Sequence, residues 1–278
     1  MISKCGIITL EKPYNARMLR FLLAIALLLA SGAAPAEDIV TLSTRAGITQ
    51  SYLISSPQKS KAQAIALLFP GSAGKTDLDY ESARTVLDRG NFLVRTRRML
   101  AENGVVAVVM DAPSDQPNGM DDLFRLGETH ADDIAKVITD MRKRFPGAPV
   151  FLVGTSRGTV SAAAAGRRLG KSIDGVVLTA TLFNSSRTQP GLGGFDYASI
   201  PVPLLFVHHV DDGCTYTPYS AARRLSDRYP LVSVSGGSPP QSKPCEAMSQ
   251  HGFLGREAET VEAMAKWMLK QPYSREIR

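Results

Sequence analysis

Five short, almost continuous apolar runs recur along this 278-residue chain, and they constrain its fold more than any other feature. They occupy residues 64–69, 105–110, 150–153, 175–180 and 204–208. Longer stretches with helical periodicity lie between and after them, at 82–101, 130–144, 157–169, 217–228 and 257–270. Strands buried on both faces are continuously apolar, and their alternation with helices is typical of parallel sheets. The pattern therefore predicts an α/β fold, with a mostly parallel, twisted sheet and helices on both of its faces.

Other segments lie outside this alternation. Residues 39–44 and 48–54 alternate in hydrophobicity, and Gly47 between them supplies a turn, so we expect an antiparallel pair at the edge of the sheet. A weaker strand is expected at 231–235. The segment 181–201 is rich in Gly, Pro, Ser and Asn and has no helical period, which predicts a loop and little or no helical lid.

The N-terminus has the pattern of a secretory signal peptide. Arg17 and Arg20 precede an apolar run at 21–30, and small residues ending in Ala-Pro-Ala follow it. The run is shorter than the roughly 20 residues that span a membrane. We therefore expect residues 1–36 to be removed and residues 37–278 to form one domain of a periplasmic or secreted protein without a stable membrane anchor. An uncleaved anchor is the alternative.

Charge gives no indication of a nucleic-acid partner. Loss of the predicted signal peptide removes four basic residues and one acidic residue, so the net charge falls from +6 to +3. A nucleic-acid-binding protein needs a clustered basic face. Five arginines do cluster within the predicted helix at 82–101, and we interpret them as a solvated helical face. They are Arg84, Arg89, Arg95, Arg97 and Arg98.

A G-x-S-x-G sequence follows the central apolar run. Gly154, Ser156 and Gly158 stand between the strand predicted at 150–153 and the alanine-rich helix predicted at 157–169. This strand-turn-helix context is the one that a nucleophile elbow requires, because the strained turn needs small neighbours and pushes the serine hydroxyl outward. The alternative is a glycine-rich turn with an ordinary surface serine.

A serine nucleophile needs a base and a group that orients the base. His251 lies in a loop just before the last predicted helix and is the candidate base, whereas His130, His208 and His209 are expected to have secondary roles.

Two acids follow the strand predicted at 204–208, namely Asp211 and Asp212, and either is a candidate for orienting His251. A purely structural role in capping the helix that begins near Thr217 is the alternative for both.

The order Ser156, aspartate, His251 resembles the α/β-hydrolase superfamily, in particular its compact dienelactone-hydrolase-like and small esterase-like members. The resemblance covers essentially the whole chain after the signal peptide and implies a serine hydrolase that needs no metal and no organic cofactor. It also favours Asp212, which stands where hydrolases with a His-Gly-x-x-Asp sequence carry their acid.

The same resemblance implies an oxyanion hole. In the superfamily, a turn after an early strand often begins His-Gly and lends a backbone N–H; here it reads Phe69-Pro70-Gly71-Ser72-Ala73-Gly74, with Pro70 in place of the histidine. The expected donors are the N–H of Ser72 or Ala73 and the N–H of Arg157. A simple strand-to-loop reversal is the alternative for this turn.

Two cysteines remain after the predicted signal peptide, Cys214 and Cys245, and an even pair in an exported protein predicts a disulfide. Such a bridge would join the loop of Asp212 to the loop of His251 and hold the proposed triad in place. Two free buried thiols are the alternative.

The substrate is less constrained. Without a lid, the cleft suits a small-molecule or polymer-end ester, with lactones, thioesters and amides as further candidates; the oligomeric state is unknown. Arg157 would either attract a carboxylated substrate or pair with a nearby acid. A phosphate-binding loop at Gly74-Lys75-Thr76 is rejected because Phe69 stands where that motif requires glycine. A non-catalytic binding protein with a hydrolase fold is the alternative function.

Overall fold

A computed structural model describes residues 36–57, 62–76, 78, 90–187 and 189–278. The predicted signal peptide lies outside these ranges except for Ala36, which is the first residue of strand β1 and pairs with Ser56 of β2.

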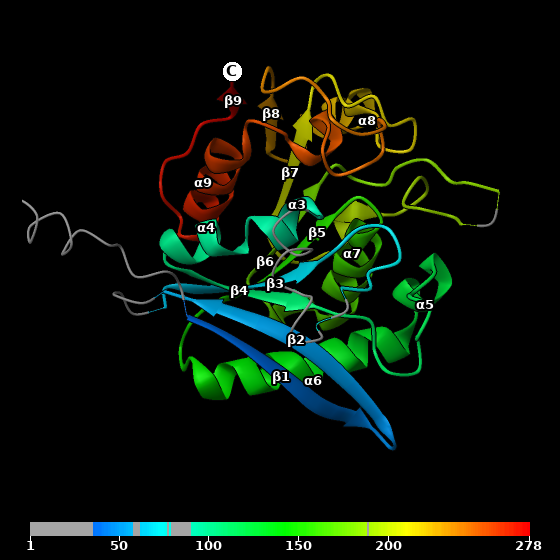
Figure 1. The fold of residues 1–278 in the computed structure, drawn as a ribbon, viewed down its shortest axis with the longest axis vertical. Helices are drawn as coiled ribbons and strands as arrows, with labels where there is room; N and C mark the ends of the chain where they lie inside the picture. The colour runs from blue at the N-terminus through cyan, green and yellow to red at the C-terminus, as the bar shows by residue number, and fades with distance from the viewer. Residues whose placement is uncertain (1–35, 58–61, 77, 79–89, 188) are drawn as a thin grey trace, which may run out of the picture. The chain divides into compact units, whose positions relative to one another are not determined.

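One nine-stranded sheet organises the described part of the chain, in the order β1-β2-β4-β3-β5-β6-β7-β8-β9 (Figure 1). β1 pairs antiparallel with β2 and β2 antiparallel with β4, as expected for the edge, and every other pairing is parallel. The strands are β1 (Ala36–Arg45), β2 (Ile48–Ser56), β3 (Ala64–Phe69), β4 (Val105–Met110), β5 (Val150–Thr155), β6 (Gly175–Thr179), β7 (Leu204–His209), β8 (Leu231–Val234) and β9 (Glu276–Ile277). Only β9 has no counterpart in the sequence-based expectation.

Helices cover both faces of this sheet. Alternate residues of each central strand point to opposite sides, and since the strands are apolar throughout, both faces must be buried. In β3, Ile65 and Leu67 belong to the same hydrophobic cluster as residues of α6, α7 and α8, whereas Ala66 and Leu68 belong to the cluster that includes residues of α3, α4 and α9. The bounds are α3 (Phe92–Arg95), α4 (Arg97–Glu102), α5 (Asp122–Leu126), α6 (Glu128–Arg144), α7 (Gly158–Leu169), α8 (Tyr219–Leu225) and α9 (Glu257–Met268). This is the predicted fold class, and it brings the carboxyl ends of the parallel strands to one edge.

The predicted helix at 82–101 differs from the structure in its described part. Two short helices, α3 and α4, meet at Thr96 there, and residues 79–89, including Arg84 and Arg89, lie outside the described residues. The solvated-face interpretation is wrong for Arg95 and Arg97, whose side chains are 7% and 0% exposed. Each has an acidic partner that periodicity could not predict: Glu257 pairs with Arg95, and Glu37 pairs with Arg97.

Two connections bear on the candidate site. The short helix α5 was not predicted; it lies between β4 and α6. The segment predicted as a loop at 181–201 contains a single 3-10 turn, Tyr197–Ser199, within its described part. Among the described residues, no helix has the length and apolar character needed to cross a membrane.

Candidate active site

Ser156 stands at the tip of a strained turn between β5 and α7. Its φ is +52°, in the left-handed region that a residue with a side chain rarely adopts, and its N–H donates to the Thr179 carbonyl at 3.0 Å. The flanking glycines are required by close approach. A Cβ on Gly154 would lie 2.5 Å from the Gly158 carbonyl oxygen, and a Cβ on Gly158 would overlap the Phe69 carbonyl.

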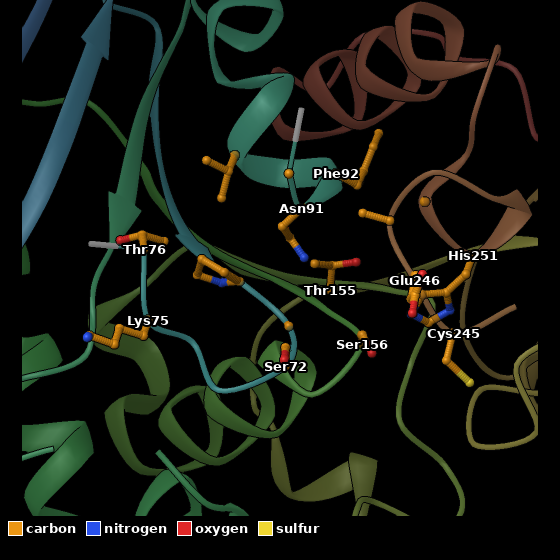
Figure 2. Close-up of a pocket in the computed structure, with 16 residues that line it drawn as sticks. Ser72, Lys75, Thr76, Asn91, Phe92, Thr155, Ser156, Cys245, Glu246 and His251 are labelled. Atoms are coloured by element: carbon orange, nitrogen blue, oxygen red, sulfur yellow. The ribbon is translucent and has the colours of Figure 1, made fainter. Parts of the chain in front are cut away.

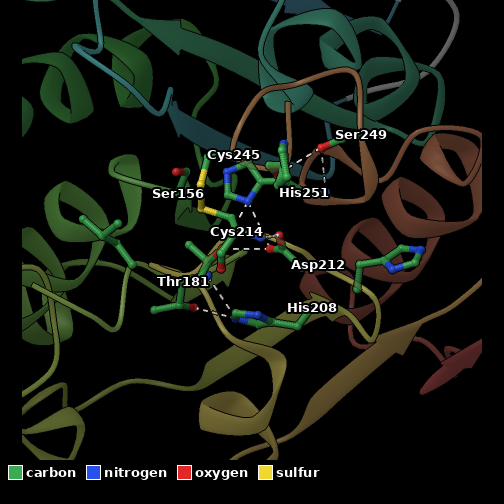
Figure 3. A network of polar contacts seen from close by, with 12 residues as sticks. Ser156, Thr181, His208, Asp212, Cys214, Cys245, Ser249 and His251 are labelled. Carbon is green, nitrogen blue, oxygen red and sulfur yellow. Dashed lines mark hydrogen bonds and ion pairs between the residues drawn. A yellow bond between two sulfur atoms is a disulfide. The ribbon is translucent and has the colours of Figure 1, made fainter. Parts of the chain in front are cut away.

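His251 and Asp212 form a buried hydrogen-bonded pair near Ser156 (Figure 3). His251 Nδ1 is 3.0 Å from Asp212 Oδ2, and their side chains are 6% and 0% exposed. Asp212 also accepts from the Thr217 hydroxyl at 2.8 Å and from the Cys214 N–H at 2.9 Å. Because a carboxylate only accepts, Nδ1 of His251 carries the proton and Nε2 keeps its lone pair. The structure thus brings Asp212, and not the exposed Asp211, to the histidine.

Ser156 and His251 line one pocket of about 510 Å³, together with residues of the turn after β3 and of α3 (Figure 2). Ser156 and His251 both lie among the described residues, and no hydrogen bond joins the Ser156 hydroxyl to His251 there. Such contacts are often long in the absence of substrate.

The turn after β3 lies directly against Ser156. A Cβ on Gly71 would be 3.0 Å from Ser156 Cβ, so any other residue at position 71 would crowd the nucleophile. Ser72 lines the pocket and has a φ of +52°, whereas Ala73 does not line it. Among the described residues, the backbone N–H groups of Ser72 and Arg157 have no hydrogen-bond acceptor.

The predicted disulfide is present. Cys214 and Cys245 are bonded, with their Cα atoms 4.6 Å apart. Cys214 follows Asp212 by two residues and Cys245 lines the pocket, so the bridge connects the loop of the acid to the wall of the pocket beside His251 (Figure 3).

The three other histidines are buried and do not line the pocket of Ser156. His208 accepts from the Thr181 N–H at 3.0 Å, and His130 lies 3.0 Å from the Ser161 hydroxyl. Burial lowers the pKa of each of these two to about 3, so both are neutral near pH 7. His209 lies 3.0 Å from the Gly236 carbonyl through Nε2. These contacts are structural, in line with the secondary roles expected.

Sequence reasoning missed several residues of the pocket. Asn91 is the N-cap of α3: its Oδ1 accepts from the Leu93 N–H at 3.1 Å, while its amide nitrogen points into the pocket in Figure 2. An asparagine before a helix is a capping signal, but the single helix expected at 82–101 concealed it. Asp111, after β4, accepts from the Thr76 N–H at 2.7 Å and so holds another part of the pocket wall.

Arg157 is engaged in an ion pair rather than free to meet a substrate. Its Nε lies 3.2 Å from Oδ1 of Asp122, a fully buried carboxylate on α5. In the described part of the chain, no group of three or more His, Cys, Asp or Glu side chains is arranged to hold a metal ion.

Comparisons with known proteins agree with this fold. Residues 100–230 match a family model described as serine aminopeptidase, S33. Among solved structures, Est1E from Butyrivibrio proteoclasticus is 15% identical, with 84% of this chain and 98% of that chain covered and a TM-score of 0.58. XC6422 from Xanthomonas campestris, described as an α/β serine hydrolase without lid, is 16% identical (86% and 96% covered, TM-score 0.56). Dienelactone hydrolase from Anabaena variabilis is 13% identical (86% and 99% covered, TM-score 0.58). No curated protein matches the chain.

The chain therefore has the fold of the lidless α/β hydrolases. The family model links it, by distant homology, to serine hydrolases.

Proposed function

We propose that this protein is a serine hydrolase that cleaves ester-type bonds through Ser156, His251 and Asp212. The observation that carries the proposal is the buried His251–Asp212 pair, whose histidine lines the same pocket as a serine in a strained strand-to-helix turn. A buried carboxylate bonded to Nδ1 holds the imidazole in the tautomer that can accept a proton at Nε2.

The chemistry is acyl transfer. Ser156 Oγ attacks the substrate carbonyl carbon while His251 Nε2 takes the hydroxyl proton, and Asp212 stabilises the resulting imidazolium. His251 then donates that proton to the leaving alcohol, which leaves an acyl group on Ser156. Water, deprotonated by His251, attacks this acyl-enzyme and releases the acid. No step needs a metal or an organic cofactor.

The oxyanion is stabilised by two backbone donors, the N–H groups of Ser72 and Arg157. Ser72 lines the pocket with Ser156, and Arg157 follows Ser156 in the chain. Neither N–H has a hydrogen-bond partner among the described residues. Each such donor is worth on the order of 3 kcal/mol in the transition state. Ala73 is the alternative to Ser72 as the early donor, and of these two residues only Ser72 lines the pocket.

The pocket suits a small or polymer-end ester. Its apolar wall includes Phe92, Val94 and Ala247, while Lys75 and Glu246 bring charge to its lining. Est1E, one of the similar structures, has been solved with ferulic acid. Aryl and short acyl esters are therefore the first substrates to screen, followed by lactones, thioesters and amides.

The direct test compares the wild type with Ser156→Ala and with Ser220→Ala, which changes an exposed serine of α8. We expect fluorophosphonate labelling and p-nitrophenyl acetate turnover in the wild type and in Ser220→Ala. We expect neither in Ser156→Ala. A folded wild type that is neither labelled nor active would favour the alternative, a binding protein with a hydrolase fold.

We also propose export, with a mature chain that begins near Glu37. The basic and apolar N-terminal segment supports it, and so does the disulfide, since disulfides persist in oxidising compartments. N-terminal sequencing of the protein recovered outside the cytoplasm tests this proposal, and an intact residue 1–36 segment would contradict it.

A further inference from the structure

Two charged side chains of α5 are buried, do not line the pocket and belong to no part of the proposed triad. Asp122 and Arg125 are 0% and 1% exposed, and both lie on a helix of five residues. Charges are rarely buried unless they are paired or hydrogen-bonded, so their partners indicate what they do.

Arg125 is bound to the turn that carries Ser72. Its Nη2 donates to the Ser72 carbonyl at 3.2 Å, and its Nη1 donates to the Ser161 hydroxyl at 2.8 Å. Gly74 has no Cβ, and the guanidinium fills the space that a Cβ would take there. The Arg125 cation therefore holds the Ser72 carbonyl and stabilises the strained, left-handed backbone conformation of Ser72.

Asp122 is bound to the residue after the nucleophile. Its Oδ1 lies 3.2 Å from Arg157 Nε, and its Oδ2 accepts from the Gly191 N–H at 3.0 Å. A buried carboxylate that loses its cation is strongly destabilised, so the Arg157 side chain is held in this position. The backbone of Arg157 begins the turn into α7, and its N–H is therefore restrained as well.

We propose that α5 positions the oxyanion hole, with Arg125 holding the Ser72 donor and Asp122 holding the Arg157 donor. The inference rests on the proposed hydrolase function and goes beyond it, because it assigns a role to residues outside the triad. Asp122 and Arg125 are positioning residues: they act on the reaction through the backbone of two other residues. Fixed donors need no reorganisation when charge develops, and a displacement of about 1 Å can cost roughly 100-fold in rate.

The test uses the mature protein and four variants: Asp122→Asn, Arg125→Met, Arg125→Lys and the control Asp133→Asn. Asp133 is an equally buried carboxylate of α6, paired with Arg45 at 2.9 Å, and it does not line the pocket. Active sites are counted by fluorophosphonate titration. The measured quantities are kcat per active site, KM for p-nitrophenyl acetate, and inhibition by a trifluoromethyl ketone, whose adduct with Ser156 carries the oxyanion.

We expect Asp122→Asn and Arg125→Met to lower kcat by about 10- to 100-fold with little change in KM. We expect their affinity for the ketone inhibitor to fall by a similar factor. Arg125→Lys, which keeps a cation, is expected to recover part of the loss, whereas Asp133→Asn lowers the melting temperature alone. Wild-type kcat and ketone affinity in folded Asp122→Asn would overturn the inference, even if Arg125→Met fails to fold. A wild type that reacts with neither the fluorophosphonate nor the ester would overturn the proposed function itself.

Discussion

Two serines in the pocket, Ser72 and Ser156, adopt left-handed backbone torsion angles with φ of +52°. For residues with a side chain this typically costs about 1–3 kcal/mol, and such strain persists only where the surroundings over-determine it. Here the surroundings are the close approach of Gly71 to Ser156 and the hydrogen bond from Arg125 to the Ser72 carbonyl. The strain lies where the proposed chemistry needs fixed groups.

Asn91 contributes a further polar group to this pocket. Its Nδ2 lies 3.4 Å from the position of a Cβ on Gly71, close to the nucleophile, and Asn91→Asp would keep the oxygen that caps α3 while replacing the amide by a carboxylate. We expect a melting temperature near that of the wild type and a fall of about tenfold or more in kcat/KM, because a negative charge opposes the oxyanion. Steady-state kinetics at neutral pH measure this change.

Asn91→Ser is the matched control, since serine also caps a helix but introduces no charge. An unchanged kcat/KM in Asn91→Asp would show that the side chain does not face the reacting carbonyl.

At the level of elements, two ties hold the loop of His251: one to the loop of Asp212, which follows a different strand, and one to α3. One tie is the disulfide between Cys214 and Cys245, separated by 31 residues in the sequence. The other is Arg95, whose Nη2 donates to the Gly252 carbonyl at 2.5 Å and to Glu257 of α9 at 2.9 Å. The position of the proposed base therefore depends on α3 and α9 as well as on its own loop.

Removal of the disulfide tests the first tie. A Cys214→Ala/Cys245→Ala variant is expected to lose about 3–4 kcal/mol of stability, as chain entropy predicts for a loop of this length. We also expect a lower kcat at 25 °C, because the acid and the base are then less well aligned. Urea unfolding and steady-state kinetics measure the two effects. Full kcat in the folded variant would assign the bridge to stability alone.

At the level of the whole molecule, buried charges make the fold sensitive to acid. Burial raises the pKa of Glu37, but hydrogen bonds from Arg98, Arg97 and Ser55 outweigh it and lower the pKa to about 2. This carboxylate stabilises the fold above its ordinary pKa of 4.5, and that contribution is lost as the pH falls toward 2. The network joins the start of β1 to α4, so it ties the first described residues to the rest of the domain.

Burial of His130 causes a second loss of folding stability, which begins at a higher pH than the loss from Glu37. Burial, with Arg125 nearby, lowers the pKa of His130 to about 3, so between pH 6.5 and about 3 the unfolded chain binds a proton that the folded protein does not. Stability is therefore unaffected by this group above pH 6.5 and falls below it, by roughly 1 kcal/mol per pH unit. We expect His130→Gln to reduce this slope in urea titrations at pH 7, 6, 5 and 4. A slope equal to that of the wild type would contradict the assignment.

The sequence by itself determined the fold class, the strands of the core and the turn at Ser156. Continuous apolar runs identify buried parallel strands, and Gly154 and Gly158 identify the strained turn, because both signals are local. It also predicted that Cys214 and Cys245 are bonded, since they are the two cysteines that remain after the predicted signal peptide.

Only the tertiary structure decided between Asp211 and Asp212, because both follow the same strand and only one reaches His251. It also decided that Arg97 is buried against Glu37, and that side chains of α5 contact the Ser72 carbonyl and the Arg157 side chain. These contacts join residues far apart in the chain, and a hydrogen bond between such residues leaves no periodic trace in the sequence. Periodicity records which face of an element is buried, whereas the partner of a buried charge depends on how the elements pack.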